Sequence, residues 1–291
     1  MTIWTAISEH IETVIGRTFV CKTTQTIGGG CINSAAKISD GQQIYFVKLN
    51  QAARREMFEA EAAGLAELAA SQTIRVPKPL TVGCSGAQSF IVMDYIALGG
   101  RTDEAAAGRQ LAALHRTTRS DYGWERDNTI GATPQFNTLD SNWCDFFCKQ
   151  RLAAQLQLAA ANGYGGRLQR SGEQLLGALS ALLDHHPPAS LLHGDLWGGN
   201  LGYDASGAPV IFDPAVYYGD RETDLAMTEL FGGFGARFYA AYREAWPLDA
   251  GYKTRKSLYN LYHILNHLNL FGGGYLLQAE RMIEQLLAHT R

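Results

Sequence analysis

The sequence predicts a bilobal α+β fold, with a small β-rich N-terminal lobe (residues 1–96) and a larger, mainly helical C-terminal lobe (residues 97–291). Strand-like runs rich in β-branched and aromatic residues, punctuated by Gly and Asp-Gly turns, dominate the first third of the chain. Apolar residues at helical spacing dominate the rest. Two short strand-like runs in the second part end in polar side chains, and these ends indicate what the chain does.

The first of these runs leads into Leu191–Asn200, which reads LLHGDLWGGN, and the second ends at Asp213. Asp195 can accept a proton from a hydroxyl group, while Asn200 and Asp213 offer the oxygen ligands that Mg²⁺ prefers. Taken alone, His-Gly-Asp would be a tight turn and Asp213 a helix cap. The complete set, with both spacings and both strand-like runs, instead favours a protein-kinase-like phosphotransferase.

Composition is that of an ordinary soluble globular protein, with 46% hydrophobic and 18% charged residues. A net charge of −3 without a basic block argues against nucleic acid as a partner. No run approaches the roughly 20 apolar residues of a membrane span, and the N-terminal segment predicts an amphipathic helix rather than a signal peptide. Five cysteines without a C-x-x-C pair favour a reducing, cytoplasmic setting. We expect a monomer or a homodimer.

The N-terminal lobe is predicted to contain five strands after the first helix: 18–27, 31–38, 44–49, 80–84 and 89–95. Gly28, Gly29 and Gly30 separate the first two strands, where the backbone could approach an anion closely. A flexible hairpin tip is the alternative. Lys48, on the next strand, favours the anion site because a strand lysine in this position can reach the phosphates of ATP.

A nucleotide-binding lysine of this kind needs a helical glutamate as partner. The helix that follows contains several glutamates, and helical spacing separates them. Glu61 falls on the apolar stripe, four residues from both Met57 and Leu65, whereas Glu59 falls on the opposite face. A buried acid needs a partner, so we assign Glu61 to Lys48.

The strand over 89–95 runs into a glycine-rich exit at Gly99 and Gly100, where a kinase-like fold would hinge. Adenine would then bond to backbone groups near Asp94 and Ile96. A plain edge strand is the alternative.

Beyond residue 97, helices are predicted over 102–118, 136–162, 168–185 and 258–287. His115, in the first of them, is expected to be a satisfied core histidine. Asp220 and Asp224 belong to an acidic stretch after Asp213. We consider both as substrate contacts, with a solvated loop as the alternative, and Asp224 also as a helix cap or a brace of the catalytic loop.

With these residues in place, the sequence resembles the fructosamine kinase (ketosamine-3-kinase) family, which is related to the aminoglycoside phosphotransferases. The resemblance covers nearly the whole chain and rests on LLHGDLWGGN with Trp197, and on the segments at 28–35, 46–50, 57–65, 212–234 and 261–275. It implies ATP- and Mg²⁺-dependent phosphorylation of the 3-hydroxyl of ketoamines, on proteins or on free amines. Elimination of that phosphate would release the amine, which would make the activity one of deglycation and protein repair.

By position in this family, Asp195 would be the catalytic base, Asn200 and Asp213 the Mg²⁺ ligands, and Lys48 with Glu61 the holder of the ATP phosphates. Trp197 would stack on the substrate. Two alternatives stay open. One is a small-molecule kinase of another specificity, such as an aminoglycoside, choline or homoserine kinase. The other is a catalytically inactive kinase fold that serves as a binding module.

Overall fold

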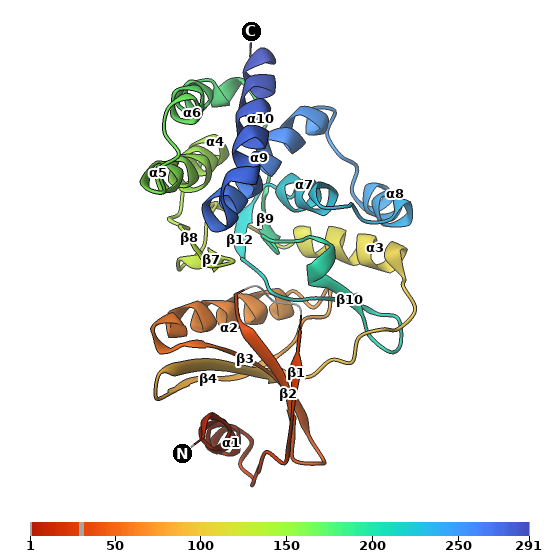
Figure 1. Ribbon diagram of the computed structural model, residues 1–291. Helices are drawn as coiled ribbons and strands as arrows, with labels where there is room; N and C mark the ends of the chain where they lie inside the picture. The colour runs from red at the N-terminus through yellow and green to blue at the C-terminus, as the bar shows by residue number, and fades with distance from the viewer. Residues whose placement is uncertain (1, 29–31, 291) are drawn as a thin grey trace. The chain divides into compact units, whose positions relative to one another are not determined.

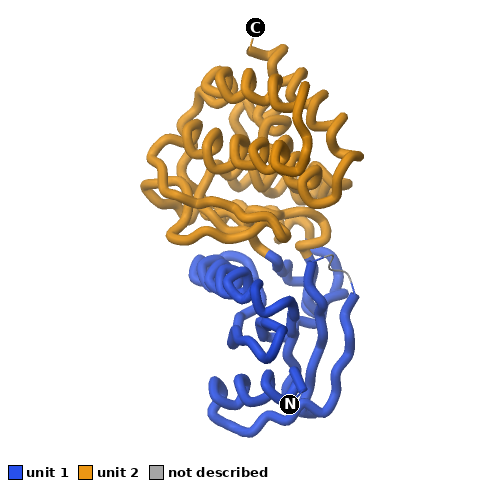
Figure 2. The backbone as a smooth tube through the Cα atoms, turned by 60° about the vertical axis from the view of Figure 1, so that its left-hand side comes forward, with its two compact units in different colours: residues 1–103, 202–213 blue, residues 104–201, 214–291 orange. Residues whose placement is uncertain are grey.

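The computed structural model describes residues 2–28 and 32–290. The chain forms two compact units, which Figure 2 distinguishes by colour. The first unit contains residues 1–103 and 202–213, and the second contains residues 104–201 and 214–291. The first unit therefore includes a late segment, 202–213, that the sequence analysis placed in the C-terminal lobe.

A five-stranded antiparallel sheet forms the centre of the first unit, in the order β1-β2-β3-β5-β4. Its strands are β1 (Thr23–Ile27), β2 (Ser34–Ser39), β3 (Ile44–Gln51), β4 (Pro79–Ser85) and β5 (Gln88–Asp94). Each expected strand is present, although β1 begins later than predicted and only five residues of it pair with β2.

Helix α1 (Ile3–Ile15) and helix α2 (Arg55–Ala70) lie on opposite faces of this sheet (Figure 1). Ile7 and Ile11 of α1 pack with Tyr45, Val47 and buried residues of β2 and β5 to form an apolar core. Side chains alternate along a strand, so Lys48, which follows Val47, points to the α2 face. A one-turn 3₁₀ segment, Ala52–Arg54, connects β3 to α2.

The late segment of the first unit forms a hairpin of β10 (Leu201–Tyr203) and β11 (Pro209–Ile211). Gly99 N–H donates to Tyr203 O at 3.0 Å, and Ile211 N–H donates to Arg75 O at 3.0 Å. A Cβ at Gly100 would lie 1.7 Å from the carbonyl oxygen of Asp204, so only glycine permits this close approach.

The second unit is mainly helical. Its helices are α3 (Glu104–His115), α4 (Trp143–Phe146), α5 (Ala154–Ala161), α6 (Arg167–Gly177), α7 (Glu222–Leu230), α8 (Ala236–Ala245), α9 (Tyr252–Phe271) and α10 (Leu276–Ala288). A π-helical segment, Phe147–Ala153, joins α4 to α5, and 3₁₀ turns lie at Leu179–Ala181, Gly198–Asn200 and Gly273–Tyr275. Among the described residues, no helix combines the length and the apolar character needed to cross a membrane.

Short strands in the second unit are β6 (Thr118–Arg119), β7 (Asn128–Ile130), β8 (Thr133–Gln135), β9 (Ala189–Leu192) and β12 (Tyr217–Gly219). They form an antiparallel sheet of order β12-β9-β6 and a β7-β8 hairpin. Strand β9 is buried throughout and leads directly into His193.

Three expected helix boundaries are wrong. The helix predicted over 136–162 begins only at Trp143, where the Asn142 side chain accepts a hydrogen bond from Asp145 N–H. Helix α6 ends at Gly177, before the predicted end at 185. The predicted helix over 258–287 is two helices, because Gly272 adopts a φ of 87°.

Candidate active site

Lys48 Nζ lies between two carboxylates of the first unit, 2.5 Å from Glu61 Oε1 and 2.6 Å from Asp213 Oδ1. The lysine is only 6% exposed. Burial alone would lower the pKa of Lys48, but the charges of Glu61 and Asp213 raise it above its ordinary value, so the ammonium stays protonated. The expected Lys48–Glu61 pair is present, and Glu59 instead pairs with Arg55 on the exposed face of α2.

Asp213 has a φ of 59°, in the left-handed region that residues other than glycine rarely adopt. Such strain persists where the surrounding structure imposes it, and it is most frequent at functional sites. The hairpin that delivers Asp213 is itself fixed: Asp204 accepts hydrogen bonds from Ser206 and Ala208 in the turn and pairs with Arg75. Asp213 is 48% exposed at its side chain, so a carboxylate oxygen can face a ligand.

In the second unit, the turn after β9 is held through its backbone. Asp224 accepts the N–H groups of His193 at 2.7 Å and Gly194 at 2.9 Å. Burial would raise the pKa of Asp224, but its hydrogen bond to His115 and the neighbouring histidine charges lower it overall. His115 also bonds to the hydroxyl of Tyr242 at 2.8 Å, so it is satisfied, as expected.

Gly194 has a φ of 83°, and a Cβ there would lie 2.0 Å from Ala215 O. The glycine of His-Gly-Asp is therefore required both by its backbone conformation and by the close approach of the 214–216 segment. Ala215 N–H in turn donates to His193 O at 2.8 Å.

Asn200 ends the 3₁₀ turn that follows Asp195 and is 5% exposed. Its amide nitrogen donates to the Asp195 backbone oxygen at 2.8 Å and lies 3.5 Å from Asp195 Oδ2. With the nitrogen directed at Asp195, the amide oxygen of Asn200 remains as an acceptor for a hard cation. Asn200 and the Asp213 carboxylate thus have the donor chemistry that Mg²⁺ requires.

The expected substrate contacts of Asp220 and Asp224 are not supported. They are 2% and 1% exposed, so neither is available to a substrate. Asp220 accepts hydrogen bonds from Tyr259 OH at 2.6 Å and His185 Nε2 at 2.7 Å. Asp224 instead braces the turn before Asp195, which was the other role considered for it.

His185, Asp220 and Glu222 bring potential metal ligands within 4.8 Å of one another. Arg255, however, binds both carboxylate oxygens of Glu222, with distances of 2.7 and 2.9 Å. A guanidinium in this position neutralises the cluster and repels a cation, so the group is an ion-pair network rather than a metal centre.

The predicted nucleotide loop lies largely outside the described residues, since Gly29 and Gly30 are not among them. Gly28 directly follows β1. At the predicted hinge, Asp94 N–H donates to Lys78 O at 3.0 Å and is therefore occupied. The backbone of Ile96 has no hydrogen-bond partner among the described residues, which leaves it available to adenine.

Trp197 follows the candidate base by two residues and is 40% exposed. Its indole lies over Gly199, where a Cβ would come within 2.3 Å of the ring. Glycine at 199 thus allows the flat indole face to lie against the 3₁₀ turn.

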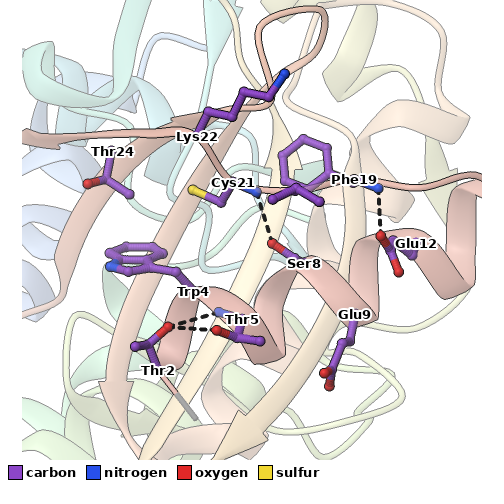
Figure 3. A pocket seen from close by; sticks show the side chains of 11 residues that line it. Thr2, Trp4, Thr5, Ser8, Glu9, Glu12, Phe19, Cys21, Lys22 and Thr24 are labelled. Carbon is purple, nitrogen blue, oxygen red and sulfur yellow. Dashed lines mark hydrogen bonds between the residues drawn. The ribbon is translucent and has the colours of Figure 1, made fainter.

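A pocket of about 440 Å³ lies between α1 and the segment leading into β1 (Figure 3). Its lining includes Trp4, Ser8, Glu12, Phe19 and Cys21. None of the candidate catalytic, nucleotide-binding or metal-binding residues lines it, so we do not assign the chemistry to this hollow.

Comparison with known proteins identifies the chain. The family model described as fructosamine kinase matches residues 3–289. The chain belongs to the fructosamine kinase family. Within this family, a protein named probable ketoamine kinase from Synechocystis sp. is 48% identical over 98% of this chain and 97% of its own length. The chloroplastic protein-ribulosamine 3-kinase of Arabidopsis thaliana is 43% identical over 90% of this chain and 82% of its own.

Comparison with solved structures agrees with this family assignment. A crystal structure of a proposed fructosamine-3-kinase from Haemophilus somnus 129PT has a TM-score of 0.90 and 31% identity, covering 98% of this fructosamine kinase family member and 97% of that chain. The aminoglycoside phosphotransferase APH(4)-Ia, in a ternary complex with ADP and hygromycin B, has a TM-score of 0.63 at 16% identity and covers 98% of both chains. This second likeness confirms the predicted protein-kinase-like α+β fold.

Sequence reasoning missed a buried polar network around Arg151, because the region from 136 to 162 was taken as a single helix. The sequence carries one signal of this network: three amide residues, Asn128, Gln135 and Asn137, lie close together in a stretch with no helical apolar repeat.

Proposed function

We propose that this protein is an ATP-dependent kinase that phosphorylates the 3-hydroxyl of ketoamines and thereby removes glycation adducts from amines. Membership of the fructosamine kinase family carries the proposal, since a relative named protein-ribulosamine 3-kinase shares 43% of its residues over 90% of the chain. The paired Lys48 and the braced His193–Asp195 turn supply the chemistry such a kinase needs. The protein would act in the cytoplasm.

In the proposed reaction, Asp195 accepts the proton of the substrate O3 as that oxygen attacks the γ-phosphorus of ATP. The bond between the γ-phosphorus and the β,γ-bridging oxygen breaks, and ADP leaves. Lys48, oriented by Glu61, neutralises phosphate charge, and the Gly28–Gly30 loop covers the phosphates. Adenine bonds to the backbone at Ile96 and at Asp94, where the carbonyl oxygen serves because the N–H donates to Lys78 O.

Asn200 and Asp213 would hold Mg²⁺, which supplies charge neutralisation of the phosphate oxygens when bound. In that role Asp213 would share its carboxylate between the cation and Lys48, with which it forms an ion pair. Trp197 offers an aromatic face to the sugar-amine substrate.

The fate of the product follows from its structure. A phosphate at C3 is adjacent to the C2 ketone. Loss of a proton from C1 gives an enaminol, and the nitrogen lone pair then expels phosphate from C3 to leave an imine. Addition of water to the imine releases the amine and a 3-deoxyosone.

Turnover on defined ketoamines tests the proposal. Purified protein is incubated with Mg-ATP and fructosyl-, ribulosyl- or erythrulosyl-lysine, with an aminoglycoside, choline and homoserine as competing acceptor classes, and ADP release is measured. We expect turnover on ketoamines only. Asp195→Ala is the matched control, with turnover lower by about 100- to 10,000-fold and nucleotide binding retained. Nucleotide binding without turnover on any acceptor would point to a binding module, and turnover on another acceptor would reassign the substrate.

A further inference from the structure

Arg151 is a fully buried cation without an acidic partner. It is 0% exposed and belongs to the π-helical segment Phe147–Ala153. Its guanidinium carbon lies 4.0 Å from the ring centroid of Tyr217 and 4.7 Å from that of Phe146. No carboxylate among the described residues forms an ion pair with it, and its Nε lacks a hydrogen-bond partner. Its Nη1 donates to the backbone oxygens of Phe136 at 2.5 Å and Gln150 at 3.1 Å. Burying a charge without an opposite charge is unfavourable, and these hydrogen bonds and the cation–π contacts offset only part of that cost. A second role would explain the presence of arginine here.

The guanidinium begins a directed chain of amides. Arg151 Nη2 donates to Asn137 Oδ1 at 2.8 Å, and Asn137 Nδ2 donates to Asn128 Oδ1 at 3.0 Å. Asn128 Nδ2 then donates to the backbone oxygen of Val216 at 2.8 Å. A guanidinium has only donors, so Asn137 must turn its oxygen toward it, and each following amide inherits its orientation. Asn137 Nδ2 also donates to Arg126 O at 3.1 Å, so Arg151 and this carbonyl together orient the amides, and the chain ends in a donor at Val216.

Gln135 adds a second branch. Its amide oxygen accepts from Tyr262 OH at 2.8 Å, and its nitrogen donates to Asn128 Oδ1 at 2.8 Å and to Ala215 O at 3.0 Å. Both branches therefore meet at Asn128 and end on neighbouring backbone oxygens.

Three consecutive residues are held in this way: Ala215 by Gln135, Val216 by Asn128, and Tyr217 by the stacked guanidinium. This segment follows Asp213 by two residues. It also bonds to the catalytic turn and its strand, since Ala215 N–H donates to His193 O at 2.8 Å and Tyr217 pairs with Leu192 of β9.

We propose that Arg151 is a positioning residue: through the amide chain and its stack on Tyr217, it holds residues 215–217 in place beside the turn that carries Asp195. The consequence for catalysis rests on the proposed kinase function, while the consequence for the 215–217 backbone does not. A displacement of the order of 1 Å in a reacting group can reduce turnover about 100-fold.

Two variants separate this role from bulk stability. Arg151→Met removes the donors and the charge, whereas Asn137→Asp keeps an acceptor for Arg151 but removes the donor to Asn128. Leu175→Ala, at a buried site on α6, is the control that destabilises the same unit by leaving a cavity. Arg151→Lys, unlike Arg151→Met, keeps the positive charge and hydrogen-bond donors but lacks the planar group that stacks on Tyr217.

The first measurement is hydrogen exchange of the peptide covering residues 214–219, well below the melting temperature. We expect faster exchange in Arg151→Met and Asn137→Asp and unchanged exchange in Leu175→Ala. The second is steady-state kinetics with a ketoamine, where we expect kcat to fall about 100-fold in both variants, with a nearly unchanged KM for ATP, partial recovery in Arg151→Lys, and wild-type kinetics in Leu175→Ala.

Wild-type exchange at 214–219 in both variants would overturn the inference, as would wild-type kcat in both. If Arg151→Met fails to fold, Asn137→Asp decides by the same two measurements. If the wild-type protein phosphorylates no ketoamine, the proposed function fails, and the exchange data alone decide whether Arg151 holds the segment.

Discussion

The backbone N–H of Gly194 donates to the carboxylate of Asp224 at 2.9 Å, across 30 residues of chain. The neighbouring N–H of His193 donates to the same side chain at 2.7 Å. An acid in the first turn of α7 thus fixes the backbone immediately before Asp195. A carboxylate suits this task because it has only acceptors for the two backbone donors.

Asp224→Asn should weaken this brace. The amide retains one acceptor oxygen, so one buried N–H of the turn loses its partner, which costs about 1–3 kcal/mol in the free energy of unfolding. We expect a lower urea midpoint and a lower kcat. Asp220→Asn is the matched control, a buried acid nearby whose partners are Tyr259 and His185; it should lose stability with a much smaller loss of kcat. Equal losses of kcat in the two variants would contradict a specific role of Asp224.

Glu61→Gln should raise the KM for ATP. The neutral amide no longer holds the Lys48 ammonium by a charged hydrogen bond, an interaction of about 1.5–3 kcal/mol, which corresponds to roughly 10- to 100-fold in affinity. Glu59→Gln, on the exposed face of the same helix, should leave the KM unchanged. Steady-state kinetics at varied ATP concentration distinguish them, and an unaltered KM in Glu61→Gln would remove Glu61 from the nucleotide site.

Asp213→Asn should change the dependence on magnesium. The amide can still accept a hydrogen bond from Lys48 but contributes no charge to a cation, so the Mg²⁺ concentration for half-maximal rate should rise roughly tenfold or more. Asp204→Asn, in the same hairpin, should leave this concentration unchanged even if stability falls. Titration of activity with Mg²⁺ at fixed ATP gives the answer. The metal assignment fails if the Asp213 variant titrates as the wild type does.

His263 should make the second unit sensitive to acid. Burial, together with the charges of His267 and Arg151, lowers the pKa of His263 to about 3 from an ordinary value of 6.5, against an opposing effect of Asp224. Because the folded-state pKa is the lower one, the unfolded chain binds the proton first. This contribution to stability is therefore complete above pH 6.5 and is lost as pH falls toward 3.

The slope from this one group approaches about 1.4 kcal/mol per pH unit within that interval. His263→Phe should flatten the pH dependence of the unfolding free energy between pH 6.5 and 4. The exposed His186 is the control, and His186→Gln should leave the slope as it is. Denaturant unfolding at several pH values measures both, and an unchanged slope in His263→Phe would refute the assignment.

The sequence was sufficient where one local rule governed the outcome. Helical spacing distinguished Glu61 from Glu59 by placing Glu61 on the apolar face. A buried acid needs a partner, and Lys48 was the available cation. The five strands of the first unit followed from their β-branched and aromatic residues and from the glycine and Asp-Gly turns between them.

The sequence was insufficient where contacts between distant segments decided the outcome. Asp220 and Asp224 resembled solvent-facing acids because their partners, Tyr259 and the backbone of Gly194, lie 39 and 30 residues away. The helix predicted over 136–162 included Asn137, whereas in the structure Asn137 lies in non-helical backbone and links Arg151 to Asn128. The three neighbouring amides are a local sign of this network, but nothing local identifies residues 215 and 216 as its partners.

The grouping of residues 202–213 with the N-terminal unit has a consequence for biosynthesis. Residues 1–103 leave the ribosome first. Arg75 can pair with Asp204, and Lys48 with Asp213, only after about a hundred further residues have been synthesised. In the nascent N-terminal part, Lys48 therefore has Glu61 as a partner but not yet Asp213, and Arg75 has no carboxylate from Asp204. The first unit is therefore complete only after residues 202–213 have been translated, which places its completion after synthesis of much of the second unit.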